Sequence, residues 1–314
     1  MLVAPLAFDS FGVRSMATFV KAGKEKIIID PGVALAPTRY GLKPTKQELL
    51  ALELAKDIVK RVGKKCNIAI VTHYHYDHHP YPEDASLYSA CFSGKRVFCK
   101  EFEKEHASAR KRGKIFLEKA RELAKSVELA DGKEAKLRGC ELAFSQAVWH
   151  GHEGSKVGRV IMVKIKEKRS VFLFGSDAQS LADKQALDYF IKAKPEFAIV
   201  DGFPTIFVGW RMSKSDFEKA NENLLIAIRK AKPKVMILDH HIVRDINFRE
   251  KMRAAFEEAK KAKVKLVTAA EFYGLPDFLL EAKRKELKKG EISEGEVESY
   301  YKKLWQAIKR KANL

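Results

Sequence analysis

The sequence predicts a mixed α/β protein in which helices cover the outer faces of β-sheets. Short runs rich in β-branched and aromatic residues alternate along the chain with longer amphipathic stretches. The chain has 314 residues, 46% of them hydrophobic, which suffices for one large core or two modest ones. No internal repeat, low-complexity tract or Gly/Ser linker divides it. This alternation favours layers of sheet and helix packed together.

Apolar runs of strand length mark the expected strands, and apolar residues at helical spacing mark the expected helices. The strands are expected over residues 2–8, 16–22, 26–30, 67–72, 96–100, 141–148, 159–166, 170–175, 197–200, 234–239 and 264–268. The helices are expected over residues 46–62, 102–129, 183–193, 213–231 and 248–262. Residues 81–131 form a long connection with a basic segment, ARKRGK at 109–114. A lid or an insertion beside a site is one interpretation of this connection.

The C-terminal part of the chain differs from the rest in its charge. Residues 276–314 are highly charged and are predicted to form a helical C-terminal extension of a domain that spans residues 1–275. The last helix carries an apolar stripe of Tyr300, Leu304, Trp305 and Ile308. Such a stripe packs against the domain or against a second subunit, so the sequence leaves the oligomeric state open. Contact with nucleic acid is the alternative.

The net charge points to an anionic partner. It is +19, from 60 Lys and Arg against 41 Asp and Glu. Such a surplus attracts polyanions, for example nucleic acid or phosphorylated metabolites. A solubilising coat of lysines is the alternative. Charged residues make up 32% of the chain, and the abundance of Lys and Glu is typical of proteins from very hot environments.

The cysteines and the hydropathy indicate the cellular compartment. The four cysteines, at 66, 91, 99 and 140, form neither a C-x-x-C pair nor a secreted-type framework, so we expect buried apolar residues. A disulfide between Cys91 and Cys99 is the alternative. The chain has no run of about 18 apolar residues and no signal-peptide pattern at its N-terminus. We therefore predict a soluble cytoplasmic protein that does not bind a membrane.

The stretch VTHYHYDHHP, residues 71–80, contains four of the nine histidines of the chain within seven positions. In an extended backbone His73 and His75 point to the same side, because side chains alternate with period two. Asp77 and His78 follow as the strand ends. This spacing is typical of two adjacent metal sites, one rich in nitrogen and one of mixed nitrogen and oxygen, suited to zinc or a similar ion. A surface loop rich in histidine is the alternative.

Further ligand-type residues follow other apolar runs. They are His150 and His152 in VWHGH, Asp177 in FLFGSD, and His240 and His241 in MILDHH. Sheets place active-site groups at such strand ends. Asp30, which ends another apolar run, is expected to hydrogen-bond a ligand histidine.

Taken together, these motifs resemble those of metallo-β-lactamase-fold hydrolases. The superfamily's motif positions occur in order as Asp30, H-x-H-x-D-H at 73–78, His150, Asp177 and His240. The strings GVRSMATFV, DPGVALAPTRYG, THYHYDHHP and LDHHIVRD resemble an archaeal branch of the superfamily. The resemblance implies a four-layer αββα sandwich over residues 1–275.

The resemblance also implies two divalent metal ions. His73, His75 and His150 would hold one ion, and Asp77, His78 and His240 the other, with Asp177 bridging both. His152 is the alternative to His150, and His241 the alternative to His240. His79 is expected to neighbour the site rather than bind metal.

Such a centre implies a hydrolase whose nucleophile is a hydroxide shared by the two ions. Zinc is expected, with manganese or iron as alternatives, and Asp77, His78 and Asp177 are expected to be catalytic. The form [ST]-H-x-H-x-D-H and the positive charge favour a phosphodiester or other anionic substrate, such as nucleic acid or a nucleotide. A small-molecule acyl hydrolase, such as a lactonase or thioesterase, is the first alternative, and a nucleic-acid binding protein without catalysis is the second.

Loop arginines are the best candidates for substrate contact. Arg14 and Arg39 flank Asp30 in the sequence and are expected to bind the anionic substrate. Lys156, Arg159 and the segment 109–114 are further candidates, although each is individually more typical of a solvated surface charge.

Overall fold

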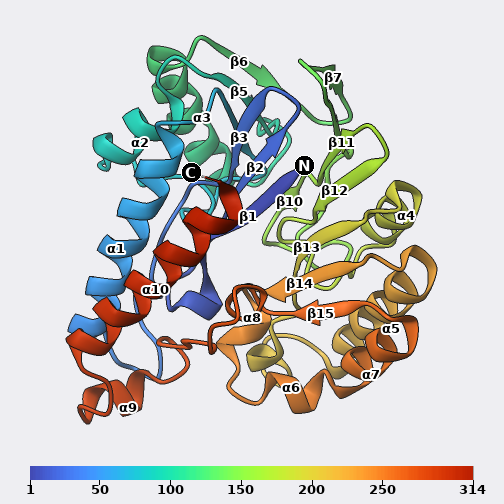
Figure 1. The fold of residues 1–314 in the computed structure, drawn as a ribbon. Helices are drawn as coiled ribbons and strands as arrows, with labels where there is room; N and C mark the ends of the chain where they lie inside the picture. Colours follow the sequence, from blue (N-terminus) through green and yellow to red (C-terminus); the bar gives the residue numbers. More distant parts are fainter. Residues whose placement is uncertain (314) are drawn as a thin grey trace.

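The computed structural model describes residues 1–313, and in it two β-sheets face each other between two outer layers of helices (Figure 1). The first sheet has six strands in sequence order: β1 (Leu2–Phe8), β2 (Met16–Ala22), β3 (Glu25–Ile29), β4 (Ile68–Val71), β5 (Arg96–Cys99) and β6 (Ser126–Leu129). Its first three strands are antiparallel, and β3 to β6 are parallel. The carboxyl ends of β3 and β4 therefore lie at the same edge.

The second sheet has seven strands in the order β15-β14-β13-β12-β11-β8-β7. They are β7 (Glu134–Lys136), β8 (Glu141–Phe144), β11 (Val163–Glu167), β12 (Ser170–Phe174), β13 (Phe197–Asp201), β14 (Val235–Asp239) and β15 (Lys265–Val267). A separate hairpin pairs β9 (Val148–Trp149) with β10 (Arg159–Val160). Strands β12 to β15 are parallel, so their carboxyl ends also share one edge.

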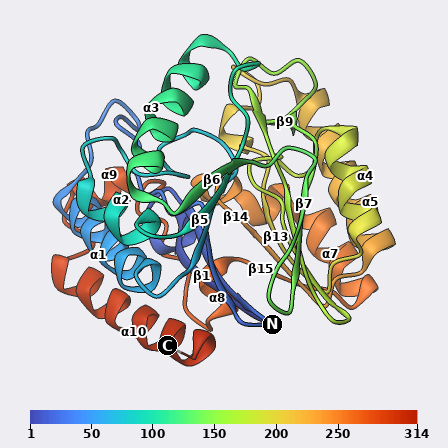
Figure 2. The same cartoon turned by 90° about the horizontal axis from the view of Figure 1, so that it is seen from above.

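Helices cover the outer face of each sheet, as seen from above in Figure 2. On the first sheet lie α1 (Lys46–Gly63), α2 (Ala85–Phe92), α3 (Ala107–Leu123) and α10 (Glu294–Ala312). On the second lie α4 (Lys184–Ala193), α5 (Lys214–Ala231) and α7 (Arg253–Ala262). Short helices α6 (Phe248–Lys251), α8 (Ala269–Phe272) and α9 (Arg284–Lys288) complete the chain. The predicted αββα sandwich is confirmed.

The main core fills the space between the two sheets and continues between the first sheet and its helices. It joins residues of the first sheet, such as Phe19 and Ile28, to residues of the second, such as Phe172 and Ile237, all of them fully buried. The central strands are buried on both faces, which is why they appear as continuous apolar runs in the sequence. A second cluster packs the outer face of the second sheet against its helices. The sheets thus form a rigid base for the loops at their edges.

Residues 81–131 contribute strands to the first sheet. The helix expected over 102–129 is wrong at both ends, because α3 covers only residues 107–123 and β6 follows it. Strand β6 pairs in parallel with β5, so tertiary pairing overrides the local helical pattern. Helix α2 and strand β7 were not predicted, and the helix expected over 248–262 breaks at Met252 into α6 and α7.

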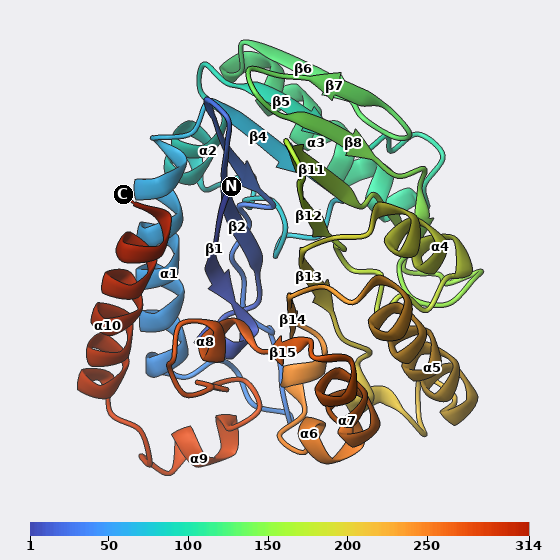
Figure 3. The ribbon, with the colours of Figure 1, turned by 45° about the vertical axis from the view of Figure 1, so that its right-hand side comes forward.

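The charged C-terminal residues pack onto the first sheet. Helix α10 lies beside α1 and β1 (Figure 3) and buries Tyr300, Leu304 and Ile308. The Tyr301 hydroxyl donates a hydrogen bond of 3.0 Å to the carbonyl of Phe11. Of the predicted extension 276–314, only Leu314 lies outside the described residues.

Two further expectations concern the cysteines and the membrane. All four cysteines are buried and free, so the structure contains no disulfide between Cys91 and Cys99. Within residues 1–313, no helix combines the length and the apolar character needed to cross a bilayer.

Candidate metal centre

The ligand-type residues meet in loops at the carboxyl ends of strands from both sheets. His73, His75, Asp77 and His78 lie in the loop after β4, and His150 follows β9. Asp177 and His240 follow β12 and β14. Sharp turns redirect the chain at these ends, because Ser176 and His240 adopt left-handed backbone conformations with φ of 51° and 62°.

The first group of side chains, which we call the histidine group, consists of His73, His75, His150 and Asp177. One ligand atom from each lies within 4.8 Å of the others. His73 Nε2 is 3.1 Å from His75 Nδ1 and 3.4 Å from Asp177 Oδ2, and His150 Nε2 is 3.1 Å from the same oxygen. Zinc ligands at their usual bond lengths lie roughly 3.3 Å apart in a tetrahedron, so the spacing fits a metal ion.

The second group, which we call the carboxylate group, consists of Asp77, His78 and His240. Their ligand atoms also converge within 4.8 Å. His240 Nε2 is 3.6 Å from Asp77 Oδ2 and 3.6 Å from Asp177 Oδ1, and His78 Nε2 is 3.1 Å from Asp177 Oδ1.

Asp177 connects the two groups through different oxygens. Its Oδ2 faces the histidine group and its Oδ1 faces the carboxylate group. Within the described residues, both oxygens, His78 Nε2 and His150 Nε2 are buried without a hydrogen-bond partner. Buried polar atoms are rarely left unpaired. These four atoms therefore fit two adjacent cations.

Asp30 contacts the loop after β4 that carries the H-x-H-x-D-H motif, and its backbone is left-handed with φ of 47°. Its carboxylate accepts hydrogen bonds from the backbone and hydroxyl of Thr72, at 2.7 and 2.6 Å, and contacts His78 Nδ1 at 2.8 Å. A Cβ at Gly32 would lie 2.3 Å from the backbone nitrogen of His79, so only glycine permits this close approach. Asp30 thus orients His78 so that Nε2 faces Asp177.

Other polar residues hold the remaining histidines. Asp9 Oδ2 contacts His240 Nδ1 at 2.6 Å, and Gln179 Nε2 contacts His150 Nδ1 at 3.1 Å. Such partners fix the orientation of a metal-binding imidazole. Asp201 Oδ2 contacts Nδ1 of His241 at 2.7 Å, which leaves Nε2 of this imidazole toward the pocket.

Arg244 places a buried positive charge beside the carboxylate group. Its Nε donates to Asp9 at 2.7 Å, and its Nη2 lies 3.4 Å from Asp77 Oδ2 and 3.2 Å from His240 Nε2. Only 5% of its side chain is exposed. Burial would lower the pKa of Arg244, but Asp9 and Glu281 outweigh it and raise the pKa further. Arg244 is therefore a permanent cation.

The pKa values differ between the groups. Burial lowers the pKa of His73 to about 3, and His78 acts in the same direction. Burial also lowers the pKa of His75 well below its usual value. Burial would raise the pKa of Asp177, but His78 and His240 hold it well below the usual range. At neutral pH His73 and His75 are therefore uncharged and Asp177 is ionised, which are the forms that bind metal. In the carboxylate group, burial would lower the pKa of His78, but Asp177 and Asp30 outweigh it and raise the pKa well above its usual value, so this imidazole is protonated in the metal-free protein.

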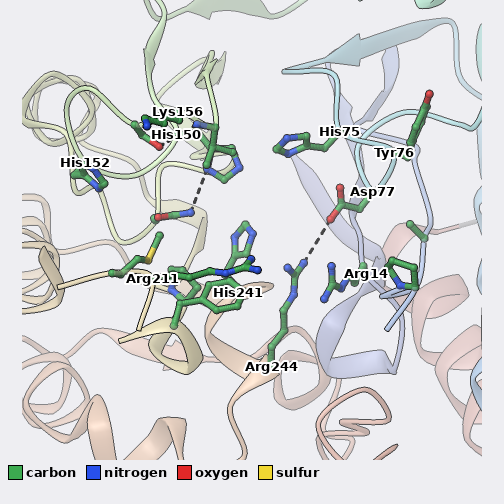
Figure 4. A pocket seen from close by; sticks show the side chains of 18 of the residues that line it. Arg14, His75, Tyr76, Asp77, His150, His152, Lys156, Arg211, His241 and Arg244 are labelled. Atoms are coloured by element: carbon green, nitrogen blue, oxygen red, sulfur yellow. Dashed lines mark hydrogen bonds and ion pairs between the residues drawn. The ribbon is translucent and has the colours of Figure 1, made fainter. Parts of the chain in front are cut away.

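A pocket of about 720 Å³ opens above the two groups (Figure 4). Asp77 is the one acidic residue among those that line it. Its cationic lining residues are Arg14, Lys156, Arg211 and Arg244. Apolar and aromatic side chains complete the walls, among them Leu35, Pro37, Tyr76, Tyr81, Phe207 and Met212.

The expected substrate arginines lie in different places. Arg14 lines the pocket, but its guanidinium is paired with Glu281 at 2.6 Å through two hydrogen bonds. Arg39 does not line the pocket; it donates to the Tyr40 hydroxyl at 3.2 Å and to the Arg244 carbonyl at 3.1 Å. Arg159 is likewise paired, with Glu105 at 3.1 Å.

The remaining histidines of the motifs lie outside the two groups. His79 is buried and packs against the rings of Tyr74 and Phe116. His152 lines the pocket but joins no ligand cluster among residues 1–313. His241 lies within 4.8 Å of Asp177 and His240 and can replace a ligand by geometry alone.

Four residues of the site were not predicted: Asp9, Gln179, Asp201 and Arg244. Asp9 and Asp201 each end an apolar strand, the same signal that identified Asp30. Gln179 and Arg244 carry no comparable local signal.

Comparison with a solved hydrolase structure agrees with the architecture. The isothiocyanate hydrolase from Delia radicum gut bacteria superposes with a TM-score of 0.52 at 13% identity, over 85% of this chain and 95% of that one. The metallo-beta-lactamase fold protein YhfI from Bacillus subtilis matches with a TM-score of 0.46 at 13% identity, over 81% and 88% of the two chains. The paired sheets, outer helices and ligand-type residues at the strand ends identify a metallo-β-lactamase fold. This fold and the two groups of His and Asp fit a metal-dependent hydrolase.

Comparison of sequences identifies the family. The UPF0282 protein MJ1629 from Methanocaldococcus jannaschii is 39% identical over 297 residues, which cover 92% of this chain and 97% of that protein. The UPF0282 protein TK1681 from Thermococcus kodakarensis is 41% identical over 304 residues, 94% and 98% of the two chains. No family model matches the chain. The chain belongs to the UPF0282 proteins, whose matched members include these archaeal relatives.

Proposed function

We propose that this protein is a binuclear metal-dependent hydrolase of phosphodiesters. The observation that carries this proposal is that the two carboxylate oxygens of Asp177 face two separate sets of ligand-type residues. His73, His75 and His150 would hold one ion, Asp77, His78 and His240 the other, and Asp177 would bridge them. Zinc suits the nitrogen-rich first set, with manganese or iron as alternatives.

Two bound divalent ions would supply a water of lowered pKa as the nucleophile and would stabilise negative charge at the attacked centre. The chain itself contributes the surroundings. Arg244 is fixed beside Asp77 and offers a positive charge to a substrate oxygen. His241 is held by Asp201, and burial and Arg244 lower its pKa well below the usual value, so the imidazole stays uncharged and its Nε2 can accept a hydrogen bond.

The lining of the pocket favours an anionic substrate. Lys156 and Arg211 face it from the loops after β9 and β13, and Asp77, a proposed ligand, is its one acid. A phosphodiester carries a negative charge that such a lining stabilises, whereas a neutral ester or lactone does not. The apolar wall of Leu35, Pro37 and Met212 favours a second candidate, an acyl hydrolase.

The test is hydrolysis by the zinc-loaded or manganese-loaded protein. Bis-p-nitrophenyl phosphate and short oligonucleotides serve as phosphodiesters, and a panel of lactones and thioesters serves as acyl substrates. We expect phosphodiester cleavage that Asp77→Ala abolishes. Asp188→Ala, which removes an exposed carboxylate on α4, is the matched control and leaves the rate unchanged.

Two results would contradict the proposal. Cleavage of the ester panel alone would favour the acyl hydrolase. Salt-dependent binding of oligonucleotides without turnover of any substrate would favour a binding protein that lacks catalysis.

A further inference from the structure

Two clusters of aromatic side chains flank the pocket. Tyr76 and Tyr81 stack with ring centroids 4.2 Å apart and planes inclined by 23°; we call this pair the tyrosine rim. Phe207 and Trp210, with centroids 5.7 Å apart, form the tryptophan rim. The tyrosine rim belongs to the loop after β4 and the tryptophan rim to the loop between β13 and α5. The rims thus come from the two opposite halves of the sandwich.

The centre lies between these rims. In Figure 4, Tyr76 and Arg211 lie on opposite sides, with His75, Asp77 and His150 between them. Tyr76, Tyr81, Phe207 and Arg211 all line the same pocket. A ligand that reaches the centre therefore has an aromatic cluster on each side of it.

Each rim also carries an arginine. The Arg211 guanidinium lies 4.2 Å from the centroid of Trp210, and that of Arg112, from α3, lies 5.9 Å from the centroid of Tyr76. Within residues 1–313 neither guanidinium has a carboxylate within 4.0 Å, and Arg112 Nε is buried without a partner. This differs from Arg14 and Arg244, whose charges are offset by Glu281 and Asp9. The rim arginines are available to an anion.

Packing does not account for the tryptophan rim. The Trp210 side chain is 64% exposed, and Tyr81 on the other rim is 39% exposed. Scattered exposed aromatics are normal on protein surfaces. Aromatic side chains stacked with unpaired arginines along a positively charged groove are instead the features that bind unpaired nucleic-acid bases and their phosphates.

We infer that the substrate is a single-stranded nucleic acid that crosses the pocket from one rim to the other. This inference rests on the proposed function. The scissile phosphodiester would lie at the centre, with one flanking base on Tyr81 and another on Trp210, and Arg112 and Arg211 would contact the adjoining phosphates. In the reaction, the oxygen of a water molecule forms a bond to phosphorus, and the bond from phosphorus to the leaving sugar oxygen breaks. The leaving sugar oxygen takes one proton from that water molecule.

The two rims also select against other anions. A mononucleotide or cyclic nucleotide has one base and can engage one rim. The bases of a duplex stack on each other and offer no free face to either rim. Of these ligands, only an unpaired strand presents one free base on each side of the same phosphodiester.

The experiment measures binding of fluorescein-labelled oligothymidylate decamers, with phosphorothioate linkages to slow cleavage, to the zinc-loaded protein by fluorescence anisotropy. Tyr81→Ala and Trp210→Ala should each weaken binding about tenfold, and the double variant about 100-fold, because each removes one stacked base. Arg211→Ala should lower the slope of log K against log salt by about one. Turnover of bis-p-nitrophenyl phosphate, which has neither bases nor adjoining phosphates, should stay within about twofold in Trp210→Ala, whose side chain does not line the pocket.

The matched control is Trp305→Ala. Trp305 lies on α10, close to the cations of Arg61 and Lys309 as Trp210 is to Arg211. Neither of these cations lines the pocket, whereas Arg211 does. This variant should bind the decamer as the unmodified protein does. Thermal melting of every variant verifies that the fold is retained.

Three results would overturn the inference: unchanged decamer binding in both rim variants, equal loss of decamer binding and of bis-p-nitrophenyl phosphate turnover, or competition by a mononucleotide as strong as by unlabelled decamer. Failure of the proposed function has a different signature. In that case the rim variants weaken decamer binding as expected, but the zinc-loaded protein cleaves no phosphodiester.

Discussion

The two ligand groups share Asp177 but differ in the charges around them. In the histidine group His73 and His75 are uncharged imidazoles, and His150 is oriented by the neutral Gln179. Carboxyl groups contact the histidines of the carboxylate group, with Asp30 on His78, and Asp9 on His240. Arg244 adds a fixed positive charge to the second group alone.

The two metal positions are therefore unequal. A cation entering the histidine group meets neutral nitrogens and one carboxylate. A cation entering the carboxylate group meets Asp77 as well, but its charge is opposed by the Arg244 guanidinium 3.4 Å from that carboxylate. Unit charges about 4 Å apart interact by about 4 kcal/mol near a protein surface. We therefore expect the histidine group to bind its ion more tightly.

The largest effect is expected from Asp177→Ala. This change removes one ligand from each group, so both ions should be lost and phosphodiester hydrolysis should fall by at least ~10³-fold. Elemental analysis after gel filtration measures the metal content, expected at about two ions in the unmodified protein. Asp77→Ala is the comparison and should remove only one ion. Two ions retained in Asp177→Ala would contradict a bridging role.

Replacing a residue that orients a histidine should weaken metal binding in one ligand group and not in the other. Asp30→Asn weakens the hold on His78, and Gln179→Ala weakens the hold on His150. Each should reduce the affinity of its own group by ~10- to 100-fold, with the greater loss for Asp30→Asn because a charged partner is removed. Competition with a chromophoric chelator measures both affinities. Equal weakening of both ions in either variant would show that the groups are not independent.

Arg244→Met should strengthen metal binding at the carboxylate group, which we expect to be the weaker of the two. The second zinc ion should bind about tenfold more tightly, because the opposing charge is gone. The metal-free protein should lose about 3 kcal/mol of unfolding free energy, since Asp9 is left buried without its guanidinium. Isothermal titration calorimetry and urea unfolding measure the two effects. Arg159→Met, which breaks a pair with Glu105 outside the ligand groups, is the control. An unchanged affinity for the second zinc ion in Arg244→Met would show that Arg244 has only a structural role.

The smallest effect concerns pH. Burial would lower the pKa of His240, but Asp9 and Asp177 outweigh it and raise the pKa to about 9 from 6.5 in the metal-free protein. A raised histidine pKa stabilises the fold fully below pH 6.5 and ceases to do so as the pH rises through 9. The melting temperature of the metal-free protein should therefore fall by a few degrees across this interval.

Bound zinc should remove most of this fall in melting temperature, because His240 then binds metal in its uncharged form. Asp9→Asn should make the fall smaller as well, since Asp9 raises the pKa of His240. A melting temperature that rises from pH 6.5 to 9 in the metal-free protein would contradict the assignment.

The sequence predicts the parts of the site that depend on local pattern. Each strand that leads into the centre is a continuous apolar run, so the residue that follows it can be located without knowing the fold. That is why Asp30, Asp177 and His240 could be identified as site residues. In the structure His150, rather than His152, belongs to a cluster of ligand-type residues, and its role as a ligand stays a prediction.

Contacts between distant segments could not be predicted. Arg244 and Asp9 are 235 positions apart and meet only because β1 and β14 end near one another. Nothing local distinguishes Arg244 from the other 59 Lys and Arg residues. Strand β6 was missed for a similar reason, because its polar sequence becomes a strand only through pairing with β5.

The position of α10 has a consequence for how the protein is made. Its buried residues Val297, Leu304 and Ile308 cover β1 and α1, the first strand and first long helix of the chain. A ribosome synthesises α10 after the other elements of this fold, so this face of the N-terminal sheet has no cover until residues 294–312 have been made. Until then a nascent chain exposes apolar surface to its neighbours. Completion of the N-terminal half should therefore follow the synthesis of α10 rather than precede it.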